Sequence, residues 1–324
     1  MAERIPPRPT DDSVPTGSQF MDSVRTLNPA QFEERVMQEI ARGNVPDFMR
    51  PENFRTMSVT MQVEGREITA AVRVCPDYLA IGSNDNHARV PISPILAQRI
   101  ARRYGFVMPT QRLVDAIDAK ARSDGGFLSF NGAGEVAARV TDSASGQKVS
   151  ARWNHKQYGA YEAKWMESPE FALEHSRMTS ERVGVPGSAM LSGHKKDIVY
   201  HPDTEKPITN KKGQVVYPGR VAIYHQGIQP FSTIHHSGYF DYSHGVRFLL
   251  SDVRLTITER DGSRREETMS MRNILNHEQY YRLFSPIRMD IDQLYLGQAE
   301  RKHTGIVPSR SGRVASRGTL QHAG

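Results

Sequence analysis

The chain contains a single cysteine, Cys75, among its 324 residues. An intramolecular disulfide is therefore impossible, and so is a Cys₄ or Cys₂His₂ zinc site. The run Ile68–Pro76 around this cysteine alternates as a strand does, so we interpret Cys75 as a buried structural residue and not as a nucleophile.

Long apolar segments are missing as well. No apolar run approaches the ~20 residues that cross a bilayer, and the start of the chain has no apolar core typical of a secretion signal. Hydrophobic residues make up 38% and charged residues 24% of the chain, a composition typical of a soluble globular protein. We therefore expect no membrane span and a cytoplasmic location at synthesis, with non-classical export left open.

The common nucleotide-binding signatures are absent too. The sequence has no G-x-x-x-x-G-K-[ST] loop and no strand–G-x-G-x-x-G–helix unit, and it also lacks H-E-x-x-H. These absences argue against nucleotide-dependent chemistry and against a zincin-type metal site.

The net charge of +6 comes almost entirely from one end of the chain. Residues 301–324 carry five basic residues and no acid, so residues 1–300 sum to about +1. We interpret 291–324 as a basic, largely disordered tail that aids solubility. Nucleic-acid binding through this tail is the alternative, and it predicts salt-sensitive binding. The sequence indicates no oligomeric state.

Helix and strand signals come in blocks and not in strict alternation. Five helices are expected to begin at Pro29, Pro94, Thr110, Ser168 and Met271, the last of them running to Phe284. Alternating apolar residues predict strands within 54–82 and again within 191–269. This order favours an α+β fold with a mixed or antiparallel sheet and peripheral helices.

The expected domain organisation follows from composition. Residues 1–22 are rich in Pro, Thr, Ser and Asp, which predicts a disordered segment. Residues 23–290 are expected to form a single domain, with a helix and hairpin part at 23–126 and a histidine-rich part at 190–285.

Six of the twelve histidines lie between His194 and His244. Imidazole accepts protons, donates protons or binds metals near neutral pH, so this clustering indicates a site for acid–base or metal chemistry. The cluster includes the motifs GHKKD, QPFSTIHH and DYSHGVR.

The motif DYSHGVR supplies the strongest candidates. Gly245 predicts a tight turn that leaves the His244 imidazole exposed at a strand edge. Asp241 is expected to orient a histidine, and Arg247 is expected to clamp a substrate carboxylate. Ser243 is a candidate nucleophile, and the alternative is a structural turn.

A second histidine, His235, precedes His244 by nine residues. Two histidines and Asp241 can hold a divalent ion such as zinc with an open position for water. We therefore consider His235, Asp241 and His244 as metal ligands, and metal-free acid–base catalysis by the same residues as the alternative.

The remaining candidates are one further acid or metal ligand and six residues that bind substrate. His194 in GHKKD is a further acid or ligand, while a charged turn is the alternative for this motif. Residues expected to contact a small-molecule or peptide-like substrate are Lys195, Lys196, Gln229, Ser232, Tyr242 and Arg247.

The segment Ser243–Arg247, SHGVR, resembles the SHG-Cys-x-Arg signature of L,D-transpeptidases, which remodel peptidoglycan cross-links through a cysteine. An upstream histidine, here His235, belongs to that family's pattern. The chain departs from the pattern at Val246, where the family has its cysteine, so a thiol acyl-enzyme at this motif is excluded.

A longer resemblance spans most of residues 30–285. The motifs GHKKDIV, PGRVAIY, QP-x-S and DYSHG-x-R recur, with PDYLAIGS, in a group of bacterial proteins that has no assigned activity. The resemblance implies one continuous unit and no particular mechanism.

These patterns lead to two functional hypotheses. The first is a hydrolase or acyl-transfer enzyme acting on peptide or cell-wall-like substrates. The second is a non-catalytic binding or structural module, for example a component of a phage or secreted particle, in which the histidines belong to the core or to an interface.

Overall fold

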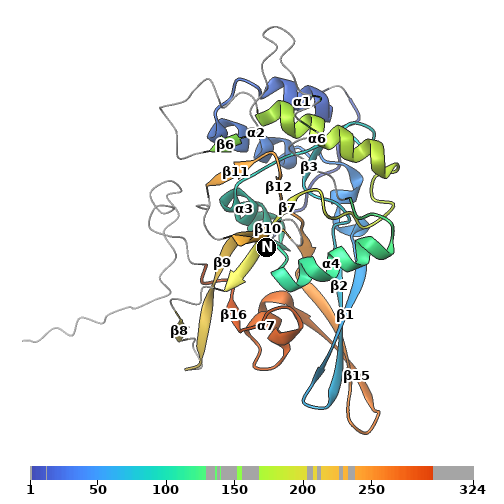
Figure 1. The fold of residues 1–324 in the computed structure, drawn as a ribbon, viewed down its shortest axis with the longest axis vertical. Coiled ribbons are helices and arrows are strands. Elements are labelled where there is room, and N and C mark those ends of the chain that lie inside the picture. Colours follow the sequence, from blue (N-terminus) through green and yellow to red (C-terminus); the bar gives the residue numbers. More distant parts are fainter. Residues whose placement is uncertain are drawn as a thin grey trace, which may run out of the picture.

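Helices dominate residues 17–41 and 94–183, and strands dominate residues 55–89 and 196–270 (Figure 1). The computed structural model describes residues 2–11, 13–128, 136, 139, 152–154, 168–202, 207–209, 213–225, 229–232 and 238–294. In these ranges the helices are α1 (Gly17–Ser23), α2 (Pro29–Ala41), α3 (Pro94–Tyr104), α4 (Gln111–Ser123), α6 (Ser168–Val183) and α7 (Met271–Asn276). Short 3₁₀ turns are η1 (Asp47–Met49), η2 (Pro51–Asn53) and η5 (Tyr280–Leu283).

Sixteen strands lie in the same ranges. They are β1 (Arg55–Val63), β2 (Arg66–Val74), β3 (Ala80–Gly82), β4 (His87–Arg89), β5 (Phe106–Val107), β6 (Arg152–Asn154), β7 (Lys196–Pro202), β8 (Ile208–Thr209), β9 (Val215–His225), β10 (Gln229–Ser232), β11 (Tyr239–Asp241), β12 (His244–Gly245), β13 (Leu249–Leu250), β14 (Asp252–Thr258), β15 (Arg264–Ser270) and β16 (Met289–Asp290).

Two larger sheets organise these strands. In the first, β1 pairs with β2, and β2 continues through β14 to β15, so hairpins from distant parts of the chain lie side by side (Figure 1). The second has the order β10-β9-β7-β12, with β8 and β16 added to β9. Their mixture of antiparallel and parallel pairs, with helices in separate blocks, confirms the α+β prediction.

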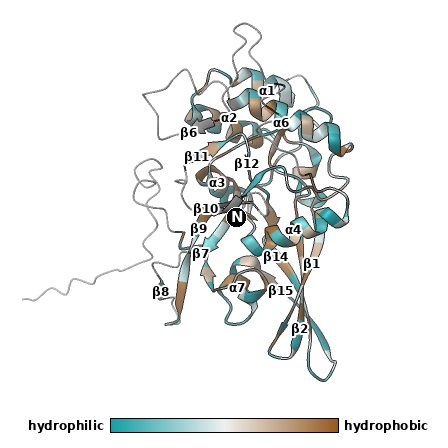
Figure 2. Cartoon of the chain, in the orientation of Figure 1, coloured by the Kyte–Doolittle hydropathy of each residue, from teal (hydrophilic) through white to brown (hydrophobic). Residues whose placement is uncertain are grey.

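The first hairpin is set by its turn and its alternation. Glu64 and Gly65 both have positive φ, 53° and 79°, as a two-residue hairpin turn requires. Figure 2 shows hydrophilic residues at the hairpin tips and more hydrophobic ones toward the body. The register that follows places Met61 opposite Ile68.

The helix boundaries follow their caps. Asn28 forms a capping box with Gln31 at the start of α2, and Phe32, Val36 and Ile40 on its apolar stripe are fully buried. Burying each such side chain stabilises the fold by about 1.5–3 kcal/mol. Ser93 and Thr110 cap the starts of α3 and α4, each through a side-chain oxygen that accepts a backbone N–H bond.

The N-terminal segment differs from the disorder that its composition predicts. The Glu3 amide donates to the Arg103 carbonyl at 2.9 Å, and Arg50 Nη1 donates to the Pro6 carbonyl at 2.9 Å. A capping box at Thr16 starts α1, which buries Phe20. Proline removes backbone donors but leaves its carbonyls free, and these accept bonds from the body of the protein.

Two elements differ from their predicted lengths. The predicted helix 271–284 ends as α7 at Asn276, because His277 is extended and its Nδ1 accepts the amides of residues 279 and 280. The sequence predicts separate strands at 215–217 and 221–224, but β9 runs unbroken through Pro218-Gly219. A Cβ at Gly219 would lie 2.9 Å from Ile291 Cα, so glycine allows the chain beyond β16 to approach.

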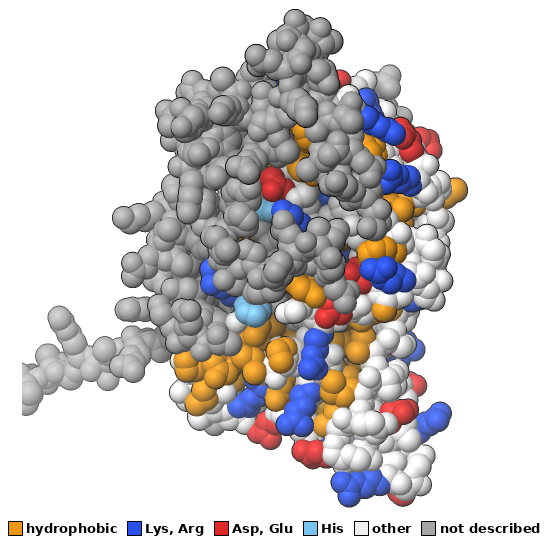
Figure 3. Space-filling model, in the orientation of Figure 1, with side chains coloured by type: hydrophobic (Ala, Val, Ile, Leu, Met, Phe, Trp, Pro, Cys, Tyr) orange, Lys and Arg blue, Asp and Glu red, His pale blue; other side chains and the backbone are white. Residues whose placement is uncertain are grey.

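The surface is mixed. On the face shown in Figure 3, hydrophobic side chains gather in the lower half with Lys and Arg side chains among them. Of the helices in the described ranges, none has both the length and the apolar composition that crossing a bilayer requires.

Candidate functional site

Two of the sequence motifs meet where β7 and β12 run parallel. His244 lies opposite Lys196, Gly245 lies opposite Asp197, and the Lys196 amide donates to the Ser243 carbonyl at 2.7 Å. GHKKD and DYSHGVR, far apart in sequence, therefore form one structural unit.

Gly245 has a different role from the one predicted. A Cβ there would lie 2.7 Å from Tyr78 Cδ1 and 3.1 Å from Lys195 Cβ, so glycine is needed for close packing between strands. The expected exposed imidazole is wrong, because the His244 side chain is 0% exposed.

The carboxylate of Asp241 lies between Lys196, Ser243 and His244, on the side of the site that solvent partly reaches. Its Oδ1 accepts bonds from the Ser243 amide at 2.9 Å and from Ser243 Oγ at 2.5 Å. Its Oδ2 lies 3.8 Å from Lys196 Nζ and 3.9 Å from His244 Nε2. Burial alone raises the pKa of Asp241, but His244, Lys196 and Ser243 together lower it to about 2.

His194 lies in the buried half of the site. Its Nε2 is 3.7 Å from Asp77 Oδ1, and its ring packs edge-on against Tyr78 and stacks on His175 with centroids 6.2 Å apart. Burial is the main cause that lowers the pKa of His194 to about 4. The ring is therefore neutral at pH 7 and cannot serve as a cationic acid in this state.

Asp77 and Arg89 were not predicted from the sequence. Arg89 Nε donates to both carboxylate oxygens of Asp77, at 3.0 and 2.9 Å, and the pair is buried. Burial raises the pKa of Asp77, but Arg89 and His194 hold it well below its usual range. Asp77 falls within the recurring PDYLAIGS motif, which was the available signal, whereas Arg89 belongs to no motif.

Lys195 is placed differently from a residue that binds a substrate anion. It is 1% exposed, and its Nζ donates to the Tyr242 carbonyl at 2.5 Å. Burial, followed by the charge of Arg89, lowers the pKa of Lys195 to about 7. An amine with this pKa is partly neutral at physiological pH and can act as a base.

Arg247 also differs from its predicted role as a carboxylate clamp. The side chain is fully buried, with Nη1 2.8 Å from the Cys75 carbonyl and Nη2 donating to the Leu191 carbonyl. Its guanidinium lies 4.5 Å from the centre of the Tyr78 ring. Arg247 thus joins three segments of the core.

Tyr78 and Asp197 also lie in the buried half of the site, and neither was a predicted site residue. Tyr78 Oη donates to Asp197 Oδ2 at 2.9 Å. Burial raises the pKa of the Asp197 carboxyl to about 7, and Arg247 opposes that rise. Cys75, which follows β2, is buried as the sequence indicates, and burial raises the pKa of its thiol to about 12.

Lys196 is partly exposed, whereas Tyr242 is buried. The Lys196 side chain is 20% exposed beside Asp241. Tyr242 is largely buried, with ring centroids 5.5 Å from Phe171 and 5.4 Å from His175. Burial raises the pKa of the Tyr242 hydroxyl.

The other predicted residues are only partly placed. Gln229 and Ser232 lie in β10, which pairs with β9 beside β7, and His235 is outside the described residues. The predicted triad of His235, Asp241 and His244 therefore stays a prediction. Among the residues that the structure does describe, no group of three or more His, Cys, Asp or Glu side chains is arranged to hold a metal ion.

Comparisons with models of protein families, with curated proteins and with solved structures found no match to this chain.

Proposed function

We propose that the ends of β7 and β12 form an acid–base site for hydrolysis or acyl transfer on a peptide-like or cell-wall-like substrate. The observation that carries the proposal is the position of the Asp241 carboxylate, 3.8 Å from Lys196 Nζ and 3.9 Å from His244 Nε2. A carboxylate held anionic beside an imidazole and an ammonium group is suited to carbonyl chemistry.

Each residue has a role in this proposal. Asp241 acts on the His244 ring through its charge, 3.9 Å from Nε2, and Nδ1 takes a proton from a water that enters with the substrate as the water oxygen adds to the substrate carbonyl carbon. The Lys196 ammonium stabilises the oxyanion that forms. His244 then returns the proton to the leaving nitrogen or oxygen as its bond to carbon breaks.

The exposed fractions of the side chains indicate how a substrate would reach the site. The Lys196 and Asp241 side chains are 20% and 13% exposed, whereas the His244 side chain is 0% exposed. A substrate therefore approaches from the side of Lys196 and Asp241. Ser243 keeps Asp241 in place through its two hydrogen bonds to Oδ1.

A substrate screen tests the proposal. Purified protein is incubated with peptidoglycan fragments and with N-acetylated peptides, and new products are identified by mass spectrometry. A product that forms with the unchanged chain and not with Asp241→Asn supports the proposal. Equal turnover by both proteins rules out the assigned role of Asp241.

A non-catalytic module is the second candidate, and one observation favours it. His194, Lys195, His244 and Arg247 are all buried, and Arg247 binds main-chain carbonyls in place of a ligand. If the cluster is purely structural, His244→Ala lowers the melting temperature and the screen yields no product.

A further inference from the structure

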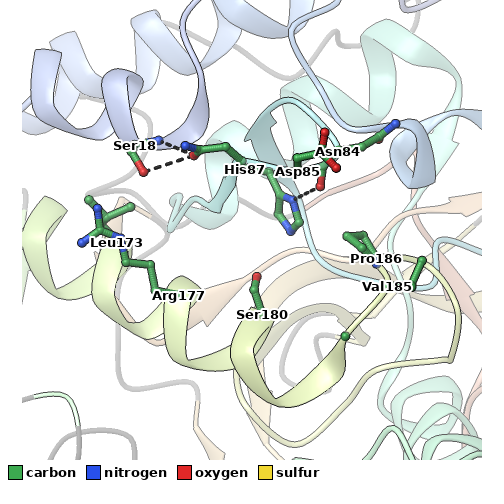
Figure 4. A pocket seen from close by; sticks show the side chains of 11 residues that line it. Ser18, Asn84, Asp85, His87, Leu173, Arg177, Ser180, Val185 and Pro186 are labelled. Carbon is green, nitrogen blue, oxygen red and sulfur yellow. Dashed lines mark hydrogen bonds between the residues drawn. The ribbon is translucent and has the colours of Figure 1, made fainter.

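A cavity of about 620 Å³ lies between α6 and the loop of residues 83–87, away from the site at β7 and β12 (Figure 4). This volume is within the ~300–1,000 Å³ of pockets that take small ligands. Leu173, Arg177 and Ser180 line it from one face of α6, while His175 projects from the opposite face toward His194. One helix thus separates two distinct environments.

His87 presents an unused acceptor at this cavity. The residue is 9% exposed, and its Nδ1 lies 3.2 Å from the Asn84 carbonyl oxygen, so Nδ1 carries the proton. The other nitrogen, Nε2, is buried and has no hydrogen-bond partner among the described residues. In Figure 4 the ring points toward Ser180 and Pro186, which also line the cavity. A ligand with an N–H or O–H donor would satisfy this nitrogen.

Arg177 supplies the positive charge of the cavity. Its side chain is 54% exposed, and within the described ranges its closest ion-pair distance is 3.9 Å, to Glu174, which exceeds hydrogen-bonding range. The guanidinium can therefore bind a carboxylate through two parallel N–H donors. Figure 4 shows Arg177 and Leu173 at one end of the cavity and Val185 and Pro186 at the other.

A second cavity of about 520 Å³ continues beyond Pro186 and shares residues 84, 85, 185 and 186 with the first. Val185 lies where the two cavities meet and is 71% exposed, one of the two large hydrophobic side chains most exposed in the described ranges. The loop that carries it is held by Arg55, whose Nε donates to the Gly187 carbonyl at 3.0 Å. An extended ligand can pass over Val185 from one cavity into the other.

We propose that this cavity binds the carboxy-terminal end of a short peptide. The terminal carboxylate pairs with Arg177, the amide N–H of the last residue donates to His87 Nε2, and the preceding residues pass over Val185 into the second cavity. Leu173 and Pro186 contact the apolar side chains. The site is independent of the chemistry proposed for Asp241 and His244.

Calorimetric titration of the full chain tests the proposal with N-acetyl-trialanine as the probe. The free acid is expected to bind, and its C-terminal amide to bind about tenfold more weakly, because only the acid can form the charged pair with arginine. Arg177→Gln should weaken binding of the acid by a similar factor. Arg182→Gln, which removes the same charge from an exposed position on the same helix, should not change binding.

The contribution of His87 has its own test. A probe N-methylated at its last residue lacks the amide donor and is expected to bind more weakly to the unchanged protein, so this measurement needs no variant. His87→Phe, with its fold checked by circular dichroism, should bind the two probes equally. Free alanine should bind more weakly than the tripeptide, because it cannot reach the second cavity.

Several results overturn the proposal. They are an absence of saturable binding up to concentrations on the order of 10 mM, equal affinity for the acid and the amide, and unchanged affinity in Arg177→Gln. Binding of alanine as tight as that of the tripeptide would also overturn it, because the ligand would then be a free amino acid and not a peptide.

Discussion

Arg89 and Asp77 form an ion pair sealed from solvent, with 2.5 Å between Arg89 Nη2 and Asp77 Oδ2 and side-chain exposures of 1% and 0%. Arg89 Nη1 also donates to Ser180 Oγ at 3.0 Å, and Asp77 Oδ1 lies 3.7 Å from His194 Nε2. The pair therefore connects α6 and β4 to the buried side of the candidate site.

Removing Arg89 should destabilise the protein strongly. Arg89→Met leaves the Asp77 charge buried without its partner, so the free energy of unfolding should fall by about 3–5 kcal/mol. Arg103→Met breaks an exposed ion pair with Glu3 and should cost about 0–1 kcal/mol. Urea denaturation followed by circular dichroism measures both, and equal losses would contradict the structural role of the Arg89–Asp77 pair.

Lys195 should make stability depend on pH in the alkaline range. Its folded pKa of about 7 is below the value of 10.5 for the free side chain, so the unfolded chain binds more protons between these limits. The free energy of unfolding therefore rises with pH from about 7 to 10.5, by up to about 1.4 kcal/mol per pH unit. Below pH 7 this gain is absent.

Lys195→Met isolates that effect, because other titrating groups contribute equally to both proteins. Urea denaturation at a series of pH values should show the difference in stability between the two proteins changing above pH 7. A constant difference would mean that the pKa of Lys195 is not lowered.

Gly245→Ala should destabilise the contact between strands. The added Cβ would lie 2.7 Å from Tyr78 Cδ1, and overpacking of this kind costs about 1–3 kcal/mol. In a Tyr78→Leu background the same methyl group should cost less, because the ring is gone. Thermal unfolding of the four proteins measures the coupling, and strict additivity would argue against a direct clash.

His244→Ala should abolish turnover if the proposed acid–base role is correct. The expected loss is about 10²–10⁴-fold, as for removal of a general base. His201→Ala on β7 is the matched control and should retain activity. A fully active His244→Ala protein would remove His244 from the mechanism.

The sequence prediction of a zinc site has a direct test. Elemental analysis of the purified protein should find about one zinc per chain if His235, Asp241 and His244 hold the ion. The His235→Ala/His244→Ala double variant should lose it. If the unchanged protein does not take up zinc, metal-free acid–base catalysis is the hypothesis that remains for this site.

Local patterns were enough to predict much of the secondary structure. Asn28-Pro29 and the spacing of Phe32, Val36 and Ile40 identified α2, since capping and helical periodicity act within a few residues. Glu64-Gly65, between two alternating apolar runs, likewise predicts the first hairpin from neighbouring residues alone. The helix expected through Phe284 ended early because a single imidazole, that of His277, accepts the amides that would have continued the turn.

The candidate site was predictable only in part. By itself the sequence determined where α2, α3, α4, α6 and α7 begin, the α+β class and the clustering of His194, Asp241 and His244 in two motifs. Tertiary structure alone decided that β12 pairs in parallel with β7, that Arg247 and Lys195 are buried, and that Asp77 and Arg89 support His194. These outcomes depend on long-range packing and desolvation, which combine distant segments and leave no periodic signal in any one of them.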